Sequence, residues 1–224
     1  MKKCNVWKAM AVCMAMVVSL CGCAKGTETT QTTQGKADES VATSEVQQEE
    51  ASQVTTVSEP VVVDIEIAEY GTITVELDAT AAPITVENFV TLAKSGFYDG
   101  LTFHRIIEGF MMQGGDPLGN GTGGSENKIK GEFTSNGVDN QLSHIRGAIS
   151  MARSRDMDSA SSQFFIVHQD STFLDGEYAV FGYVTEGIEV VDKVCTEATP
   201  LDGNGTISAE QQPVITSITV RENE

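Results

Sequence analysis

An arginine and a glutamine stand on either side of an apolar run in residues 103–116, which read "FHRIIEGFMMQGGD". Arg105 offers a charged guanidinium donor and Gln113 offers an amide, while Phe110 and Met111 between them offer an apolar surface. The segment has no obvious nucleophile and no obvious general base. These residue types suit a chemistry that needs positioned hydrogen-bond donors beside an apolar surface rather than covalent attack.

A short match to a hydrolase motif lies nearby. Residues 125–128, "SENK", fit the Ser-x-x-Lys pattern of penicillin-binding enzymes. Neither of the partner motifs, Ser-Asp-Asn and Lys-Thr-Gly, follows, and Ser125 falls in a glycine-rich loop rather than at the start of a helix. Matches of four residues arise by chance, so the sequence does not indicate a serine hydrolase.

Residues 200–211, "PLDGNGTISAEQ", resemble a calcium-binding loop in part. Asp202 fits the pattern, but Pro200 and Gln211 stand at the first and twelfth ligand positions, where carboxylates are needed. We interpret the segment as a surface turn. The histidines also lack metal-ligand spacing and are expected to be structural; they are His104, His144 and His168. The sequence therefore predicts no metal and no cofactor.

Length and charge limit the possible functions. The 224 residues are 40% hydrophobic, which suffices for one domain with a sizeable core. The chain carries 32 acidic against 14 basic residues, a formal net charge of −18. Phosphate contacts need a basic surface, so nucleic acid is not an expected partner.

Residues 1–22 have the features of an export signal. Three lysines near the start precede the short apolar run "AMAVCMAMVVSL". The following "LCGCAKG" resembles a bacterial lipoprotein signal, in which Cys23 is acylated and becomes the mature N-terminus. Cys21 is a poorer candidate because the bulky Leu20 precedes it. Processing would shift the net charge from −18 to −21, since Lys2, Lys3 and Lys8 are lost and no acidic residue is. An ordinary secretory signal with incidental cysteines is the alternative.

The lipidated Cys23 would begin a flexible tether over residues 23–60. Residues 24–60 are rich in Thr, Gln, Ser, Glu and Ala and contain no aromatic residue, so they cannot bury enough apolar surface to fold. As a random coil, these 37 residues would reach about 33 Å. An interaction region is the alternative interpretation of this composition.

The remaining residues, 61–224, have the pattern of one mainly β domain. Alternating residues on both sides of a glycine-containing turn predict a β-hairpin over 61–78. Helical spacing predicts one helix over 82–96 and a second over 187–195, where Cys195 falls on the apolar stripe as a core residue. Short strands are expected at "LTFHRII", "GFMMQ", "RGAISMA", "SQFFIVH", "YAVFGYV" and "PVITSITV". Many strands with two helices predict a closed antiparallel barrel or a sandwich.

Several segments of this domain, in their order and spacing, resemble the cyclophilins, a family of peptidyl-prolyl isomerases. They are "FHRIIEGFMMQGGD", "NGTGG", "GAISMA", "SQFFIVH" and "FLDGEYAVFG", and "APITVENFVTLAKSGFYDG" is similar to the family's first helix and the turn after it. The resemblance covers essentially all of residues 61–224. It implies an eight-stranded closed antiparallel β-barrel with an α-helix capping each end.

The implied reaction accounts for the residue types. Rotation about an X–Pro bond crosses a barrier of ~18–20 kcal/mol without making or breaking a covalent bond. The twisted transition state loses amide resonance, and the prolyl nitrogen then regains a lone pair that can accept a hydrogen bond. Arg105 can donate that hydrogen bond, and no nucleophile is required.

The resemblance also implies roles for further residues. Gln113 would bind the substrate backbone and orient Arg105, and Ala152 and Arg153 would lie on the segment that pairs with the peptide. Gln163 would line the adjoining groove. The pocket for the proline ring would be formed by Phe110, Met111, Phe165 and Leu174.

Two positions depart from the best-known eukaryotic members of the family. Phe173 stands where they carry tryptophan, and Tyr178 stands where they carry histidine. Both residues keep an apolar wall to the groove. We therefore expect weakened binding of the inhibitor cyclosporin rather than loss of catalysis.

These inferences predict an extracytoplasmic isomerase that is lipid-anchored to the bacterial cell membrane and acts on Pro-containing, unfolded or nascent exported polypeptides. One alternative is a proline-segment binding module or holdase chaperone with incidental turnover. Another is a solute-binding or cell-wall lipoprotein. The sequence has no strong interface signal, so we expect a monomer.

Overall fold

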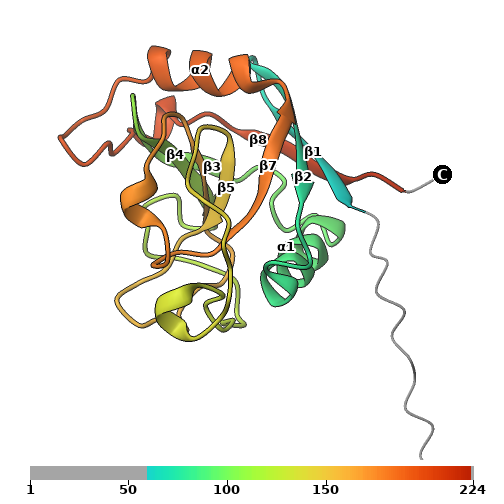
Figure 1. Cartoon of the computed structure of the whole chain (residues 1–224). Coiled ribbons are helices and arrows are strands. Elements are labelled where there is room, and N and C mark those ends of the chain that lie inside the picture. Colours follow the sequence, from blue (N-terminus) through green and yellow to red (C-terminus); the bar gives the residue numbers. More distant parts are fainter. Residues whose placement is uncertain (1–59, 223–224) are drawn as a thin grey trace, which may run out of the picture. The chain divides into compact units, whose positions relative to one another are not determined.

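The computed structural model describes residues 60–222, and Figure 1 shows its helices and strands. The predicted signal peptide (1–22), the lipidated Cys23 and all but the last residue of the tether (23–60) lie outside the described residues. Within residues 60–222, neither helix is long and apolar enough to cross a membrane.

The described chain forms eight strands and two α-helices. The strands are β1 (Val61–Ile67), β2 (Gly71–Leu77), β3 (Thr102–Ile107), β4 (Met111–Asp116), β5 (Ala148–Met151), β6 (Phe164–Val167), β7 (Val180–Glu186) and β8 (Ile215–Val220). The helices are α1 (Pro83–Lys94) and α2 (Ile188–Glu197). Three short 3-10 helices lie at Thr134–Asn136, Thr172–Leu174 and Ala209–Gln211. The predicted hairpin, both predicted helices and the predicted strands are confirmed.

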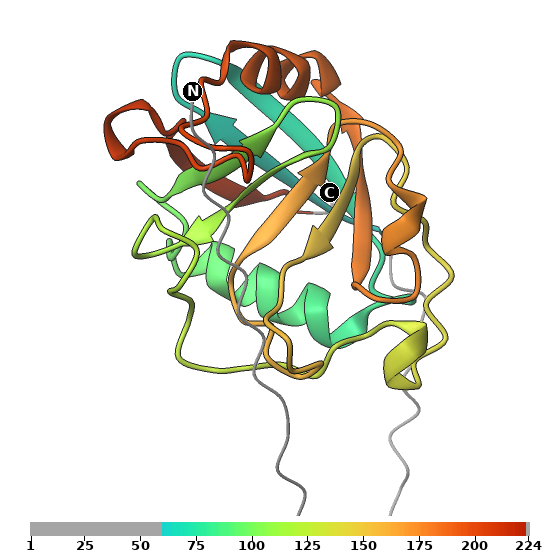
Figure 2. The same cartoon turned by 90° about the vertical axis from the view of Figure 1, so that its left-hand side faces the viewer.

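All neighbouring strands are antiparallel, and they form one sheet in the order β3-β4-β6-β5-β7-β2-β1-β8. Figure 2 shows this sheet curling round, with α1 and α2 lying at opposite ends of it. Three pairs of strands that are consecutive along the chain are also paired in the sheet, namely β1–β2, β3–β4 and β5–β6. The remaining pairings join strands that are not consecutive along the chain, and one of them, β4–β6, places Phe165 opposite Gln113, which itself lies opposite Arg105 of β3.

The prediction of a closed barrel was wrong, because the sheet is a curled half-barrel. Its two edges come together at the start of both edge strands: Thr102 of β3 bridges Val214, which precedes β8, and Ile215 of β8 exchanges backbone hydrogen bonds with Gly100 and Leu101, which precede β3. Further along β3, the loop before β8 takes the place of a neighbouring strand. There Ile106 donates its N–H to the carbonyl of Gly205 (2.8 Å), and Ile207 donates its N–H to that of His104 (3.0 Å). This loop lies on the edge of β3 and prevents the two edge strands from pairing along their length.

Helix α1 begins against a buried carboxylate. Pro83 occupies the first turn, where its missing N–H costs nothing. The next two N–H groups, of Ile84 and Thr85, donate to the carboxylate of Glu132 at 3.1 and 2.7 Å. An anion at a helix N-terminus also interacts favourably with the helix dipole. Glu132 is 2% exposed, so these hydrogen bonds satisfy a charge that would otherwise be costly to bury.

The apolar side chains form two separate clusters. The larger one fills the inside of the sheet and includes tilted and edge-to-face contacts among the rings of Phe89, Tyr98, Phe164 and Phe181. Cys195 on α2 belongs to it, and burial raises the pKa of its thiol to about 12, as expected for a core residue. A smaller cluster with Met111 and Phe165 at its centre lies on the other face of β4 and β6.

The histidines are built into the domain, as the sequence predicted. The ring of His144 lies between the carboxylate of Asp175 (Nδ1 to Oδ1, 2.8 Å) and the hydroxyl of Ser150 (Nε2 to Oγ, 3.0 Å). Nδ1 of His168 accepts the N–H of Gly109 at 2.9 Å. His104 is 4% exposed, and neither of its ring nitrogens has a hydrogen-bond partner within the described part of the chain.

Two of these histidines should make the stability of the domain depend on pH. Burial lowers the pKa of both His104 and His144, although the neighbouring carboxylates Asp116 and Asp175 oppose the shift. Below about pH 6.5 the unfolded chain therefore binds protons that the folded chain does not. The free energy of unfolding should fall as the pH drops from 7 to 5, by up to about 1.4 kcal/mol per pH unit for each histidine.

Urea unfolding at a series of pH values measures this slope. Replacing His104 and His144 by glutamine should flatten it between pH 7 and 5, whatever the stability of the variants at pH 7. A slope that persists unchanged in the double variant would assign the effect to other groups.

Candidate active site

A small cavity on the outer face of the sheet brings most of the predicted site residues together. Its volume is about 180 Å³. Nine of the eleven residues assigned to catalysis or substrate binding line it: Arg105, Phe110, Met111, Gln113, Ala152, Arg153, Phe165, Leu174 and Tyr178. The other two, Gln163 and Phe173, lie next to it. The residues come from β3, β4 and β6 and from the connections β3–β4, β5–β6 and β6–β7, so no single stretch of sequence forms the cavity.

The guanidinium of Arg105 is held from two sides. Arg105 on β3 lies opposite Gln113 on β4 in the strand register. Its Nη1 donates to Oε1 of Gln113 at 3.3 Å and contacts Sδ of Met111 at 3.8 Å. Its Nε donates to the backbone carbonyl of Asn204 at 2.7 Å. Within the described residues, Nη2 donates to no protein acceptor. The side chain is thus fixed while one donor group stays available to a ligand.

Partial burial lowers the pKa of Arg105 from its ordinary value, while Tyr178 and Asp202 oppose the shift. A guanidinium nevertheless keeps its proton in proteins. The guanidinium carbon also lies 5.9 Å from the centre of the Phe110 ring, a distance at which a cation is attracted to an aromatic face. Arg105 therefore presents a permanent positive charge at the wall of an apolar cavity.

Gln113 is oriented by a chain of amides. Its Oε1 faces Arg105, and its Nε2 donates to Oε1 of Gln163 at 2.9 Å. Nε2 of Gln163 donates in turn to the carbonyl of Gly123 at 2.7 Å. These bonds fix which end of each amide is donor and which is acceptor. One N–H of Gln113 remains for a ligand. Gln163 itself lines an adjoining polar hollow of about 330 Å³.

The floor and wall of the cavity are aromatic and aliphatic. Met111 and Phe165 are 1% and 5% exposed, so they belong both to the outer apolar cluster and to the cavity surface. The ring of Tyr178 meets that of Phe165 nearly edge-on, at 6.0 Å and 83°. The guanidinium of Arg153 lies over Tyr178 at 4.8 Å and donates to the carbonyl of Glu177. The charged group of Arg153 therefore stabilises the wall.

Beside the cavity, the backbone also offers hydrogen-bonding groups to a ligand. Ala152 donates its N–H to the carbonyl of Gln163 at 2.9 Å, which extends the pairing of β5 with β6. The N–H and the C=O of the next residue, Arg153, make no hydrogen bond among residues 60–222. An extended peptide lying beside the cavity could pair with these two groups.

Phe173 lies at the rim of the cavity rather than in its wall. It is 73% exposed, and its ring packs against that of Phe110 at 5.6 Å and 33°. The resemblance had placed it in the groove wall. The short 3-10 helix that carries it places it instead where it extends the apolar surface of Phe110 outward.

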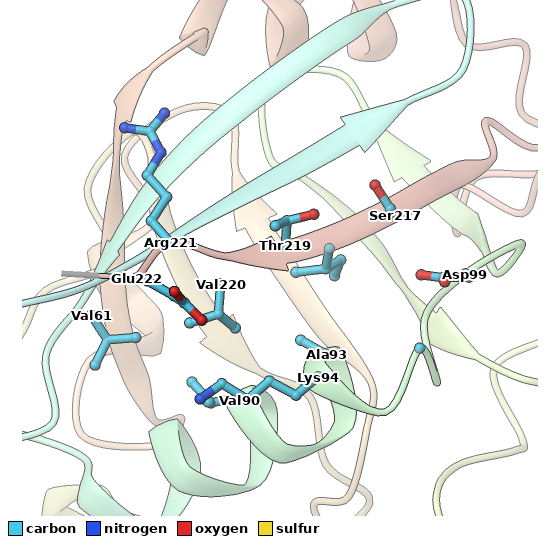
Figure 3. A pocket seen from close by; sticks show the side chains of 12 residues that line it. Val61, Val90, Ala93, Lys94, Asp99, Ser217, Thr219, Val220, Arg221 and Glu222 are labelled. Carbon is cyan, nitrogen blue, oxygen red and sulfur yellow. The ribbon is translucent and has the colours of Figure 1, made fainter. Parts of the chain in front are cut away.

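A larger hollow exists elsewhere in the domain, and it lacks the chemistry of the small one. It has a volume of about 820 Å³ and lies between α1 and β8, where Figure 3 shows Val90 and Lys94 of the helix below the strand. The guanidinium of Arg221 points away from the helix and is bound to both oxygens of Asp64 at 2.8 Å. Lys94, the other basic residue that lines the hollow, is exposed, so among residues 60–222 no charged donor is fixed above an apolar floor there.

One contributor to the small cavity was missed in the sequence, namely the carbonyl of Asn204. The pairing of β3 with the loop around Gly205 brings it to Arg105 from 99 positions away. A backbone carbonyl has no signature in the residue types. The loop had been recognised only as a turn with an incomplete calcium pattern.

Comparison with known proteins identifies the family. The family model "Cyclophilin type peptidyl-prolyl cis-trans isomerase/CLD" matches residues 62–220. A peptidyl-prolyl cis-trans isomerase of Helicobacter pylori is 52% identical over 126 residues, which cover 55% of this chain and 75% of that protein. Peptidyl-prolyl cis-trans isomerase B of Bacillus subtilis is 53% identical over 114 residues, covering 51% and 76%.

The crystal structure of a Cryptosporidium parvum cyclophilin type peptidyl-prolyl cis-trans isomerase superposes with a TM-score of 0.65 at 30% identity. The match covers 74% of this chain and 100% of that one. The fold, the family model and the relatives agree with one another. The chain therefore belongs to the cyclophilin family of peptidyl-prolyl cis-trans isomerases.

Proposed function

We propose that this isomerase accelerates rotation about X–Pro bonds in exported proteins at the outer face of the cell membrane, with no covalent intermediate. The observation that supports this most is the guanidinium of Arg105, which is fixed by Asn204 and Gln113 at the wall of an apolar cavity. The test is whether the chain accelerates cis–trans interconversion of a short X–Pro peptide and whether an Arg105→Ala variant fails to do so.

The proline ring would enter the cavity and contact Phe110, Met111, Phe165 and Leu174. The residues flanking proline would pair with the free backbone groups of Arg153 and with the remaining N–H of Gln113. Holding the peptide on both sides of the rotating bond lowers the entropic part of the barrier, because only the rotation itself is left to occur.

In the twisted transition state, Nη2 of Arg105 would donate to the lone pair of the prolyl nitrogen. Shortening a reaction from tens of seconds to milliseconds is a factor of about 10⁴, or about 5.5 kcal/mol. A preorganised charged donor in a site shielded from water supplies around half of this free energy. Positioning of the peptide would supply the rest.

The proposed location rests on Cys23, which lies outside the described residues. Replacing Cys23 by serine should prevent acylation and move the protein from the membrane fraction to a soluble or unprocessed form. One acyl chain anchors a protein only marginally, so stable retention presumes the diacyl modification that the signal "LCGC" implies.

Fractionation after washing at high salt and alkaline pH measures the effect, and Cys21→Ser is the matched control because only Cys23 follows a small residue. The control should stay in the membrane fraction. Membrane retention through both washes of a Cys23→Ser protein whose signal has been removed would refute lipidation at Cys23.

A further inference from the structure

The shortest hydrogen bond of Arg105 is with a loop that the proposed mechanism does not otherwise use. Nε of Arg105 lies 2.7 Å from the carbonyl oxygen of Asn204, whereas Nη1 lies 3.3 Å from Oε1 of Gln113. A hydrogen bond at Nε holds the base of the planar guanidinium, so it fixes the direction in which both terminal nitrogens point. The position of the Asn204 carbonyl therefore determines where Nη2 is aimed.

That carbonyl is held in place by a turn built around Asp202. Oδ1 of Asp202 accepts the N–H of Asn204 at 2.9 Å and the N–H of Thr206 at 3.1 Å. Oδ2 accepts the hydroxyl of Thr206 at 2.9 Å. One exposed carboxylate thus organises three donors within four residues. Such Asx-type bonds are the usual way in which an aspartate shapes a turn.

Backbone hydrogen bonds join this turn to β3, the strand that carries Arg105. The carbonyl of Gly205 accepts the N–H of Ile106 at 2.8 Å, and Thr206 forms an isolated antiparallel β-bridge with Arg105. Gly205 has a φ of +83°, and a Cβ there would lie 2.4 Å from Cγ1 of Ile107 and 2.6 Å from the carbonyl oxygen of Ile106. The backbone on both sides of the Asn204 carbonyl is therefore closely packed on β3, and its direction depends on the turn.

We infer that Asp202 is a positioning residue for the isomerase: it shapes the turn that presents the Asn204 carbonyl to Nε of Arg105 and so aims Nη2 into the cavity. This inference rests on the proposed role of Arg105. The inference also assigns a role to the segment that resembles an incomplete calcium loop. The carboxylate of Asp202, which would bind the cation in such a loop, accepts the N–H groups of its own turn instead. Asp202 does not line the cavity and is not itself a catalytic residue.

Loss of the turn should affect turnover rather than binding. In an Asp202→Ala variant the Asn204 carbonyl loses its fixed direction, and the guanidinium then samples several orientations. The apolar floor and Gln113 are unchanged, so peptide binding should stay close to that of the wild type. We expect kcat to fall about tenfold with KM changed less than about twofold, because misplacing a catalytic group reduces rate more than affinity.

A conservative variant separates the shape of the turn from its charge. Asp202→Asn keeps an oxygen that can accept the N–H groups of Asn204 and Thr206 but removes the negative charge. Its kcat should stay within about threefold of wild type. If it falls as far as in Asp202→Ala, charge and not the turn is responsible, and the inference is overturned.

The matched control is Asp78→Ala. Asp78 accepts two N–H groups of its own turn, from Thr80 and Ala81, both at 2.9 Å, and it does not line the cavity. Asp78→Ala should lower the unfolding midpoint without changing kcat. Equal losses of kcat in the two alanine variants would show a general effect of a loosened domain and would contradict the assignment.

Placing each Asp202 variant in an Arg105→Ala background distinguishes this inference from the proposed function. If Asp202 acts through Arg105, Asp202→Ala should cause no further loss of kcat once Arg105 is gone. In NMR spectra of the full chain, the Nε–H proton of Arg105 should lose the chemical shift typical of a hydrogen-bonded proton in Asp202→Ala and keep it in Asp78→Ala.

The outcomes are separate for the two claims. Near-wild-type turnover of Arg105→Ala would reject the proposed function itself. Two outcomes would reject the role of Asp202 and keep the proposed function. In both, Arg105→Ala has a low kcat; in the first, Asp202→Ala has a kcat close to wild type, and in the second, the double variant loses a further tenfold in kcat.

Discussion

Replacing Arg105 by alanine is expected to lower kcat/KM for a short X–Pro peptide by about 100-fold or more while the domain stays folded. Such a loss corresponds to about 2.7 kcal/mol of transition-state stabilisation. The physical reason is that Nη2 is the charged donor left free beside the apolar cavity, after Nε and Nη1 have bound Asn204 and Gln113. The rate of isomerisation can be measured from a change in absorbance or from NMR line shapes.

Arg105→Lys is the informative companion variant. An ammonium keeps the charge but cannot hold the Asn204 carbonyl and Gln113 at once in the planar arrangement of a guanidinium. We therefore expect its turnover to be low as well. Circular dichroism and thermal unfolding should show that both variants are folded. A folded Arg105→Ala protein with turnover close to wild type would reject the mechanism.

Replacing Phe173 by tryptophan is expected to strengthen inhibition by cyclosporin about tenfold to a hundredfold. The resemblance implies that the tryptophan of the best-known eukaryotic members would donate its indole N–H to the drug, and Phe173 has no such donor. Leaving a buried acceptor without its partner costs about 1–3 kcal/mol. Phe173 is 73% exposed at the rim beside Phe110, so a larger indole has room there.

Turnover of the Phe173→Trp variant should change little, because Phe173 does not line the cavity that would hold proline. Phe173→Leu is the control: it also removes the phenyl ring and adds no donor, so its inhibition should not become stronger. If cyclosporin inhibits Phe173→Trp and the wild type equally, Phe173 does not determine drug sensitivity, and its assignment to this edge of the groove is wrong.

Local sequence patterns were enough to predict the elements of the fold. The alternation of residues in 61–78 predicted β1 and β2, and the spacing of Val86, Phe89 and Ala93 predicted the buried face of α1. Such patterns are informative because a helix or strand must bury one face wherever it packs, and the apolar residues of that face recur at the period of the element. The same argument placed Cys195 on the buried face of α2.

Closure of the sheet could not be predicted in the same way. Whether β3 pairs with β8 depends on competition between two segments for one strand edge, and the loop at Gly205 occupies most of the edge. The loop carries Gly, Asn and Asp residues that indicate only a turn. Nothing in its periodicity shows that it will dock on a strand about a hundred residues earlier.

The candidate site was predictable in its side chains and not in its backbone. Arg105, Gln113 and the apolar residues around them belong to segments with recognisable order, and the structure brings them to one cavity. The Asn204 carbonyl and the free backbone groups of Arg153 have no residue signature, because every residue carries the same groups. The rim position of Phe173 depends on a 3-10 helix of three residues, which is too short to leave a periodic pattern.

The most direct test of the account measures rotation while the peptide is bound. In NMR exchange experiments with an X–Pro peptide at saturating concentration, the wild-type chain should interconvert the bound cis and trans forms within milliseconds. The Arg105→Ala variant should bind the peptide with an affinity within a few-fold of wild type and interconvert it about 100 times more slowly or worse. If the wild type binds the peptide and the bound forms interconvert no faster than in free solution, the groove is a binding module, and the catalytic account given to Arg105 is wrong.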